Sequence, residues 1–358
     1  MAGFAKQANS APIFSIQNAT VSPPTGDKGD FLSYAPYWWP NPNDPKAAWI
    51  KKDGEINPDI LQLTQQSDLS AMTASVRVSV TSGFLNQEDK NGFDHAAKQL
   101  RTWFIDPNTR MNPNANYGQV VRNANPLSWI GRFEAILSVR QLAFIPSAVE
   151  LLASGYKGWG AQDMQAIKSW FGKYLNWLIN PPFQPEENTG KNNHRTYWAC
   201  QVVEYQRFLD RHADAESTLA TFANTYLPQQ VNATGGMPLE MARTRPYHYA
   251  LFNLDALVYL ASFADQVRPD TGKPYYDLWS AQDHAIKRAM DLLVKSYSFD
   301  LIEEGDVGLY IRLLKIFISK FGDATGEYGR VLNGLGDYPE AVYALTPLYL
   351  KNGPPSMT

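Results

Sequence analysis

A helical spacing of apolar residues runs through most of this chain and limits the folds that it can adopt. After Pro58 the sequence DILQLTQQSDLSAMTASVRVSVTSGFL places apolar residues three and four positions apart, which is the period of an amphipathic helix. Alternation of the kind that predicts strands is scarce. The same spacing predicts further helices at roughly 90–104, 127–141, 146–154, 161–179, 195–212, 214–226, 248–266, 278–296, 306–320 and 338–350.

This series of helices predicts an all-α protein. No tight repeat recurs along the chain, which disfavours an array of small helical repeats. Antiparallel helix pairs in this number can close into an α/α toroid or an incomplete barrel of about ten or more helices. We expect that fold class, with the inner helices lining a broad groove.

The first 58 residues differ in character from the rest. SPPTGDKGD and WWPNPNDPK are dense in Pro, Gly, Asn and Asp, the residues that interrupt regular structure. We expect residues 1–58 to form an extended N-terminal arm that packs on a toroidal catalytic domain of residues 59–358. Arm and toroid together are expected to make a single structural domain.

Composition argues against several classes of function. The net charge is −3 and no basic stripe is present, so nucleic acid is not an expected partner. No apolar run is long enough to span a bilayer. Cys200 is the only cysteine, which excludes an internal disulfide and a cysteine-based zinc site. Since no histidines have metal-binding spacing, we expect neither a metal nor a cofactor.

Aromatic residues are frequent, with ten Trp and nineteen Tyr, and their rings often stack on sugars. In SYAPYWWPNP, residues 33–42, four aromatics stand among prolines that restrict the backbone. This segment is either a rigid sugar platform or a loop that packs against the helices. Its candidate binding residues are Tyr34, Tyr37, Trp38 and Trp39.

A second segment, MNPNANYGQVVRNANP at residues 111–126, is a long loop rich in amides. Amides bind hydroxyls, and loops carry binding residues more often than helices do. The segment is either a sugar-binding loop or a solvated connector. Its candidate binding residues are Asn116, Tyr117, Gln119, Arg122 and Asn125.

A third segment, ENTGKNNHRTYWACQ at residues 187–201, collects amides, cations and a histidine at an expected helix start. Free backbone N–H groups and the helix dipole favour negative charge there. Asn193 can donate a hydrogen bond to a carboxylate, and His194 can take a proton near neutral pH. The alternative is an Asn cap beside a surface histidine. The neighbouring candidate binding residues are Lys191, Asn192, Arg195, Tyr197 and Trp198.

A fourth segment, MPLEMARTRPYHYALFNLDAL at residues 237–257, favours a catalytic role for Asn193 and His194 in the third segment. Arginine suits bidentate carboxylate binding, and a phenol beside cations can accept a proton as well as donate one. The candidate residues are Arg243, Arg245, Tyr247, His248 and Tyr249.

Together the third and fourth segments fit the β-elimination of a uronic acid polymer. The C5 proton becomes acidic enough only when the neighbouring carboxylate is neutralised, for which Asn193 with Arg243 or Arg245 is available. Tyr249 or His194 can remove the proton, and Tyr249 can protonate the departing O4. Hydrolysis would instead need two positioned carboxyl groups, and no such pair stands out.

These segments, in this order, resemble blocks of the alginate lyase-like polysaccharide lyases of the α/α-toroid class. SYAPYWWPNP followed by KKDGEINPD is similar to the amino-terminal signature of that family. MNPNANYGQ, NNHRTYW and PLEMARTRPYHYALFNLDAL are similar to later blocks. The resemblance runs from about Phe31 to about Leu260.

The resemblance implies a catalytic group. Asn193 and Arg243 would neutralise the carboxylate, His194 would assist them or act as the base, and Tyr249 would act as the acid and also as a candidate base. Two alternatives stay open, Arg245 in place of Arg243 and His194 in place of Tyr249 as the base.

Stereochemistry bears on the substrate. In mannuronate and glucuronate the C5 hydrogen and O4 lie on the same face, so one tyrosine can serve as base and acid. Guluronate is inverted at C5 and needs a base on the opposite face, for which His194 is the candidate. We expect an anionic polysaccharide of the alginate or glucuronan type as the substrate.

Two other functions remain possible, an α/α-toroid glycoside hydrolase and a non-catalytic protein that binds uronate polysaccharides. The first twenty residues lack the basic-then-apolar pattern of a signal peptide. Because polymers do not enter cells readily, we expect a secreted protein from which a signal has been removed. No feature of the sequence indicates an oligomeric state.

Overall fold

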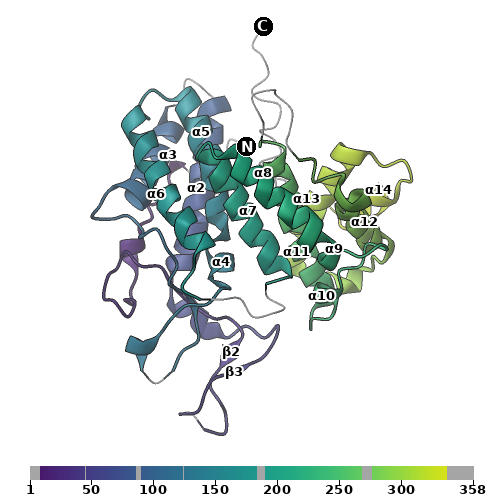
Figure 1. Ribbon diagram of the computed structural model, residues 1–358, viewed down its shortest axis with the longest axis horizontal. Coiled ribbons are helices and arrows are strands. Elements are labelled where there is room, and N and C mark those ends of the chain that lie inside the picture. The colour runs from purple at the N-terminus through teal and green to yellow at the C-terminus, as the bar shows by residue number, and fades with distance from the viewer. Residues whose placement is uncertain are drawn as a thin grey trace. The chain divides into compact units, whose positions relative to one another are not determined.

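The computed structural model describes residues 9–44, 46–85, 90–123, 125–183, 190–267 and 276–336 (Figure 1). Most of these residues are helical, so the all-α prediction is confirmed. The chain divides into two compact units. Unit 1 comprises Met1–Glu186 with Glu204–Arg211, and unit 2 comprises Glu187–Val203 with His212–Thr358.

Unit 1 places short strands and helical turns ahead of its main helices. Its elements are η1 (Ile16–Asn18), β1 (Leu32–Tyr34), β2 (Trp38–Trp39), β3 (Ile50–Lys51), η2 (Pro58–Gln62), α2 (Gln65–Leu85), α3 (Asn91–Leu100), η3 (Arg101–Ile105), β4 (Tyr117–Val120), η4 (Pro126–Ser128), α4 (Ala135–Ser138), η5 (Arg140–Phe144), α5 (Ile145–Gly155) and α6 (Ala161–Ile179).

The regular elements of unit 2 are all helical in its described residues. Its elements are α7 (Asn193–Phe208), α8 (His212–Thr221), η6 (Phe222–Tyr226), α9 (Leu227–Gln230), α10 (Pro238–Met241), α11 (Pro246–Ala264), α12 (Ala281–Lys295), η7 (Phe299–Leu301), α13 (Glu304–Phe321) and α14 (Glu327–Gly334). The residues of α7 from Glu204 onward belong to unit 1.

Helix α2 organises the helices of unit 1 and packs against α3 and α5 (Figure 1). Its buried apolar residues recur at intervals of three and four: Leu69, Met72, Val76 and Val80. Gly83 allows a close approach, because a Cβ at that position would lie 2.8 Å from the Phe93 ring. The helical period that predicts α2 from the sequence therefore also defines its packing face.

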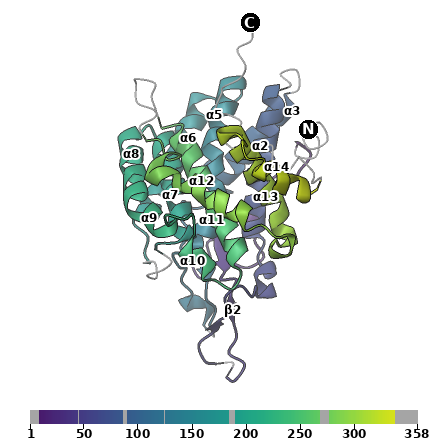
Figure 2. The same ribbon diagram turned by 90° about the vertical axis from the view of Figure 1, so that its right-hand side faces the viewer.

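The strands of unit 1 form two small sheets. β1 pairs in parallel with β4, and β2 pairs with β3 in an antiparallel hairpin that extends away from the helices of this unit (Figure 2). Between the paired residues, β4 contains one residue more than β1, because Leu32 lies opposite Tyr117 and Tyr34 opposite Val120. Gln119 takes up this bulge with a φ of 54°, which is uncommon for a residue other than glycine.

A buried ionic cluster lies in unit 1 where the end of α7 meets α5. Arg207 donates to both oxygens of Glu204 at 2.8 and 2.9 Å and to both oxygens of Glu150 at 2.9 and 2.8 Å. Ser147 donates to Glu204 at 3.1 Å. Burial alone would lower the pKa of Arg207, but the two carboxylates raise it above its ordinary value. The cluster is a structural ion pair with bidentate geometry on both sides.

Helix α11 forms the core of unit 2. Its sequence is apolar on nearly every face from Ala250 onward, and almost all of its side chains are buried. Helices α12 and α13 pack against it, and α14 packs against both of these (Figure 2). A helix that is apolar all round needs neighbours on several sides, which explains its central place in this unit.

The predicted helix at 127–141 is wrong. The structure has η4, an irregular stretch, α4 and η5 in its place. The backbone N–H groups of Gly131 and Arg132 donate to the carbonyls of Asn116 and Gly118, at 2.7 and 3.1 Å. A Cβ on Gly131 would lie 2.6 Å from the Asn116 carbonyl oxygen, so this close approach depends on glycine. Tertiary hydrogen bonds have replaced the helical ones.

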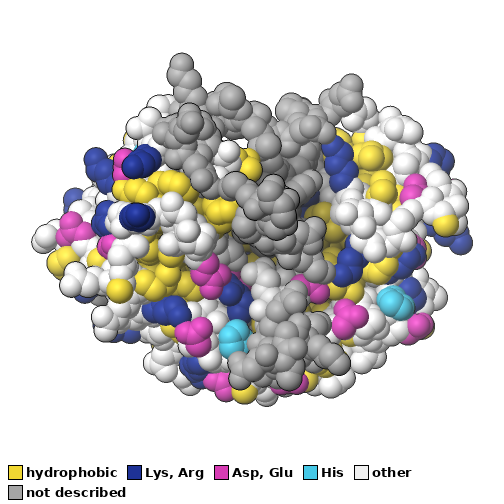
Figure 3. Space-filling model, turned by 90° about the horizontal axis from the view of Figure 1, so that it is seen from above, with side chains coloured by type: hydrophobic (Ala, Val, Ile, Leu, Met, Phe, Trp, Pro, Cys, Tyr) yellow, Lys and Arg dark blue, Asp and Glu magenta, His cyan; other side chains and the backbone are white. Residues whose placement is uncertain are grey.

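The remaining predicted helices correspond to helices of the structure, with shifted ends. Residues 338–350 lie outside the described residues, and α14 was not predicted. In the described part of the chain, no helix combines the length and the apolar character that crossing a membrane requires. On the face shown in Figure 3, basic and acidic side chains are interspersed.

Candidate active site

Helix α7 begins at Asn193, two residues before the start of the predicted helix at 195–212 and within the segment where a helix start was expected. Asn192 Oδ1 accepts the backbone N–H of His194 at 3.1 Å, and the Asn192 carbonyl accepts the N–H of Arg195 at 2.8 Å. These bonds satisfy amide groups that the first helical turn leaves without partners. The predicted helix start is therefore confirmed, and it fixes the backbone on both sides of Asn193.

A buried polar network holds the residues at the start of α7. Gln230 Nε2 donates to the carbonyls of Lys191 and Asn192 at 2.9 and 3.1 Å. Thr196 Oγ1 lies 2.8 Å from both Gln230 Oε1 and Asn253 Oδ1. The sequence analysis did not single out Gln230, which lies outside the four segments, or Asn253, which lies within the fourth. Buried networks of this kind are stabilising when each member has partners, so these bonds help to fix the backbone of Lys191 and Asn192.

Asn193 is 1% exposed and is bound by an equally buried carboxylate, Glu240. Its backbone N–H donates to Glu240 Oε1 at 2.7 Å, and Nδ2 lies 2.9 Å from both carboxylate oxygens. The two carboxylate oxygens of Glu240 lie close together, whereas the two amide hydrogens of Asn193 point well apart. A single amide hydrogen can therefore be shared between both oxygens. Within the described residues, Asn193 Oδ1 is buried without a hydrogen-bond partner. The amide therefore keeps one donor and one acceptor for another molecule.

Our sequence reading also missed Glu240. The signal was present, since Glu240 belongs to the PLE block that precedes the arginines. Its role was not evident from the sequence, because a carboxylate repels the uronate that would bind nearby. In the structure it orients the amide of Asn193.

His194 follows Asn193 and is half-buried. Its Nδ1 lies 2.8 Å from Asn192 Oδ1, the same oxygen that accepts the His194 backbone N–H. A backbone N–H can only donate, so the Asn192 atom is its oxygen and not its nitrogen. Nδ1 must then donate, and the neutral ring carries its lone pair on Nε2. This tautomer is the one that a base acting through Nε2 requires.

Arg243 and Tyr249 are in direct contact. The guanidinium carbon lies 3.7 Å from the centroid of the Tyr249 ring, and Tyr249 is 4% exposed. The N–H of Arg243 donates to the carbonyl of Glu240 at 3.1 Å. A continuous series of contacts therefore runs from Asn193 through Glu240 and Arg243 to Tyr249, all within unit 2.

Arg245, the alternative to Arg243, forms an ion pair with a glutamate. Its guanidinium forms a two-pronged ion pair with Glu303, which directly precedes α13. Tyr247 is buried and its hydroxyl donates to the Leu293 carbonyl at 2.9 Å. Burial raises the pKa of Tyr247 to about 12. Both side chains hold the start of α11 in place, and of the two arginines only Arg243 lies against Tyr249.

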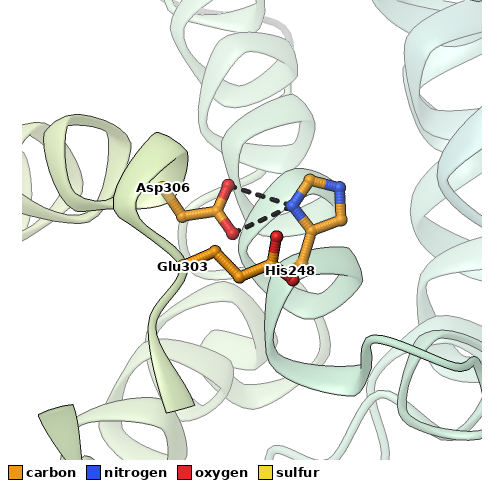
Figure 4. Close-up of side chains that lie close together, drawn as sticks. All are labelled: His248, Glu303 and Asp306. Atoms are coloured by element: carbon orange, nitrogen blue, oxygen red, sulfur yellow. Dashed lines mark hydrogen bonds and ion pairs between the residues drawn. The ribbon is translucent and has the colours of Figure 1, made fainter. Parts of the chain in front are cut away.

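The described residues contain one grouping with the composition of a metal site, formed by His248, Glu303 and Asp306 (Figure 4). Their ligand atoms lie within 4.8 Å of one another. His248 Nδ1 lies 2.9 Å from both oxygens of Asp306, and Glu303 is paired with the Arg245 guanidinium. A divalent cation would have to displace this guanidinium from Glu303, so the arrangement suits an ion-pair network better than a metal.

Three other predicted binding residues, Arg195, Tyr197 and Trp198, make packing contacts in the first turns of α7. Arg195 Nε donates to the Gly190 carbonyl at 2.8 Å, and its guanidinium lies 4.8 Å from the ring centroids of Trp198 and Tyr226. Burial lowers the pKa of Arg195 from its ordinary value. Tyr197 is buried, with its hydroxyl 3.3 Å from the Phe252 carbonyl.

In unit 1, Arg122 and Tyr34 are built into the fold. Arg122 lies between two rings, 4.3 Å from the centroids of Tyr34 and Trp49, and forms a 2.9 Å ion pair with Asp59. Tyr34 is buried, and this burial raises its pKa above the ordinary value for tyrosine. Tyr34 therefore packs as the second alternative for its segment predicts, whereas the contacts of Arg122 are those of neither a sugar-binding loop nor a solvated connector.

The other candidate residues of unit 1 are half-buried or exposed. Trp39 Nε1 donates to the Glu55 carbonyl at 3.0 Å, with Lys52 Nζ 5.0 Å from its ring centroid. Asn116 Oδ1 accepts the indole N–H of Trp177 at 2.7 Å. Half-buried rings or amides are also found at Tyr37, Trp38, Tyr117 and Gln119, and Asn125 is exposed and caps η4. A role for these residues in sugar binding stays a prediction.

Comparison with known proteins bears on both fold and activity. The alginate lyase family profile matches residues 15–301. Among solved structures, the crystal structure of an alginate lyase from Bacteroides ovatus matches with a TM-score of 0.81 and 26% sequence identity, covering 96% of this chain and 92% of that chain. Comparison with curated proteins gives no significant match.

The structural match confirms the predicted class of α/α toroids. The family match covers most of the chain, including all four blocks on which the sequence resemblance rested. It places the protein among enzymes that cleave by elimination, and not among the glycoside hydrolases. We conclude that the chain belongs to the alginate lyase family and is a polysaccharide lyase.

Proposed function

We propose that the enzyme cleaves a polyuronate that contains mannuronate or glucuronate, by β-elimination, with Asn193, His194, Arg243 and Tyr249 as its catalytic residues. The observation that carries this proposal is the series of contacts from Asn193 through Glu240 and Arg243 to Tyr249. Residues that lie about 50 positions apart in the sequence thereby belong to one connected cluster of unit 2.

Asn193 and Arg243 bind and neutralise the substrate carboxylate in this proposal. The amide of Asn193 is buried and oriented by Glu240, yet retains one N–H and an oxygen without a partner in the described residues. A buried polar group in this condition calls for a ligand or a water, since burial without hydrogen bonds is unfavourable. The retained N–H can donate to the uronate carboxylate while Arg243 supplies the positive charge.

Tyr249 transfers the protons. A guanidinium 3.7 Å from its ring centroid stabilises a phenolate electrostatically. The phenolate can take the C5 proton, and the resulting phenol can give a proton to O4 on the same face of the sugar. This suits mannuronate and glucuronate. On guluronate the C5 proton lies on the other face, and His194 Nε2 is the base.

The substrate class follows from this chemistry and from the family. Alginate contains mannuronate and guluronate, and the Bacteroides ovatus protein is described as an alginate lyase. Glucuronan presents the same C4 and C5 configuration as polymannuronate, so the catalytic residues admit both. A polymeric substrate suits an enzyme that acts outside the cell.

One screen tests the proposal. The enzyme is incubated with polymannuronate, polyguluronate, glucuronan and a glycosaminoglycan, while ultraviolet absorbance and reducing ends are followed together. We expect both signals to rise in parallel on polymannuronate or glucuronan, because elimination leaves an unsaturated sugar. Reducing ends without absorbance would indicate hydrolysis, and oligouronate binding without either signal would indicate a non-catalytic protein. Either outcome would refute the proposal.

A further inference from the structure

A tyrosine that serves as base and then as acid must begin each cycle as a phenolate. Phenols ordinarily ionise near pH 10, so the proton lost by Tyr249 needs a place to reside at neutral pH. This question arises only if the proposed function holds. The residue next to Tyr249 offers an answer.

His248 and Asp306 form a carboxylate–imidazole pair beside Tyr249. His248 Nδ1 lies 2.9 Å from both oxygens of Asp306, which stands in the first turn of α13 (Figure 4). The His248 and Tyr249 rings meet edge to face, with centroids 5.0 Å apart. The imidazole is therefore in contact with the ring that carries the phenol.

The pair fixes the tautomer of His248. A carboxylate accepts and cannot donate, so Nδ1 carries a hydrogen and the neutral ring has its lone pair on Nε2. Across the described residues, Nε2 of His248 makes no hydrogen bond. A basic nitrogen is thus left open on a side chain that is 22% exposed.

Several charged groups surround this imidazole. The charged groups around it are Asp306, Glu303, Arg245 and, beyond the Tyr249 ring, Arg243. Glu303 is already balanced by Arg245. The carboxylate of Asp306 is largely buried, and His248 is its one ion-pair partner among the described residues. An imidazolium at His248 neutralises that carboxylate, as the aspartate of a catalytic triad stabilises its imidazolium.

We propose that His248, held by Asp306, stores the proton that Tyr249 must release before catalysis. The O–H bond of Tyr249 breaks and an Nε2–H bond forms on His248, directly or through one water, giving a phenolate and an imidazolium. The phenolate then takes the C5 proton and becomes a phenol. It returns a proton to O4 as the C4–O4 bond breaks, which regenerates the phenolate. The proton on His248 is not consumed, and no further reactant is required. His248 and Asp306 are positioning residues in this scheme.

The test is the pH dependence of kcat in Asp306→Asn. We expect kcat near pH 7 to fall about 10- to 100-fold and to recover as the pH approaches the ordinary ionisation range of a phenol, because Tyr249 can then lose its proton to solvent. His248→Gln, which keeps a donor for Asp306 but is not a base, should show the same alkaline shift. Asp306→Glu should restore part of the neutral-pH activity. Glu327→Gln, at an exposed glutamate paired with Arg330, is the control and should leave the pH profile of kcat unchanged.

A purely structural role for the pair predicts otherwise. Asp306→Asn and His248→Gln would then lower kcat by the same factor at every pH, or leave it unchanged, and either result would overturn the proposal.

A second measurement does not depend on activity. Nitrogen-15 NMR of histidine-labelled enzyme, with His248 assigned through His248→Gln, should show the Nδ1–H tautomer when the ring is neutral. The Nε2–H tautomer would overturn the proposal even for an active enzyme. If the wild type cleaves no polyuronate, the proposed function fails and the proton-store proposal fails with it. If the wild type is active but the variants keep its pH dependence of kcat, only the proton-store proposal is refuted.

Discussion

The loops of unit 1 and the start of α7 in unit 2 contain the same kinds of residue, namely amides, arginines and aromatics, but use them differently. In unit 1, Arg122 has two aromatic rings and an aspartate as partners, and Tyr34 is buried against it. In unit 2, Asn193 is also buried and still keeps an oxygen without a partner in the described residues.

This difference shows how binding residues can be distinguished from packing residues of the same type. A polar group that the fold satisfies contributes to stability, and its removal should lower the free energy of unfolding. A buried polar group that the fold orients and leaves unsatisfied has a cost in the empty protein, and that cost is recovered when a ligand binds. By this criterion we propose that Asn193 belongs to the site, and we expect Arg122 to belong to the scaffold.

The largest expected effect is on the rate of the Tyr249→Phe variant. Loss of the hydroxyl should lower kcat about 10²- to 10⁴-fold, the range of a general acid or base, with little change in the melting temperature. The neighbouring Tyr247→Phe removes a hydroxyl bonded to the Leu293 carbonyl and should cost stability, about 1 kcal/mol, more than rate. Steady-state kinetics and thermal melts of both variants check this contrast. Wild-type turnover in Tyr249→Phe would remove Tyr249 from the mechanism.

His194→Ala should separate the substrates. If the enzyme accepts both polymers, its rate on polyguluronate should fall about 10²-fold or more, because the base on that face is lost, and its rate on polymannuronate should fall much less. Parallel assays of one enzyme preparation on the two polymers measure the ratio. Equal losses on both would show that His194 is not a separate base for guluronate.

Glu240→Gln tests whether a buried carboxylate orients Asn193. The change keeps the shape of the side chain and removes the negative charge of the carboxylate, whose oxygens accept the backbone and side-chain N–H groups of Asn193. We expect a loss of about 1–3 kcal/mol in unfolding free energy and a roughly tenfold fall in kcat. Glu327→Gln, at an exposed glutamate paired with Arg330, is the control and should alter neither by much. Full activity in Glu240→Gln would mean that Asn193 needs no such support.

The smallest expected effect on catalysis is that of Arg122→Leu. Loss of two ring contacts should lower the unfolding free energy by about 1–2 kcal/mol and leave KM nearly unchanged. The measurements are denaturant unfolding and KM on the preferred polymer. Arg330→Leu, at an exposed arginine, is the control for losing an arginine side chain. A large rise in KM without a loss of stability would place Arg122 in the binding site and undo the contrast between the two regions.

Several parts of the site could be predicted from the sequence because they depend on local chemistry. The start of α7 at Asn193 follows from the amides before an apolar periodic segment, and α11 follows from its continuous apolar run. The residue types in the third and fourth segments point to carboxylate binding and proton transfer without any coordinates. The choice between Arg243 and Arg245 did not follow, since both lie near Tyr249 in the sequence.

Other parts depend on contacts between distant segments. The helix expected at 127–141 fails because Gly131 and Arg132 give their N–H groups to carbonyls near β4, which no local pattern reveals. No sequence motif marks a role for the carboxylates of Glu240 and Asp306, and only their partners Asn193 and His248 give them one.

The sequence alone determined the helical character of this protein, the start of the helix that carries Asn193 and His194, and the chemistry available to their side chains. These properties depend on the period of apolar residues and on groups within a few positions of one another. The tertiary structure decided which arginine lies on Tyr249, which carboxylate orients Asn193, and which polar groups remain without partners. Those outcomes depend on hydrogen bonds and burial between segments about 50 residues apart, and such contacts exist only once the chain has folded.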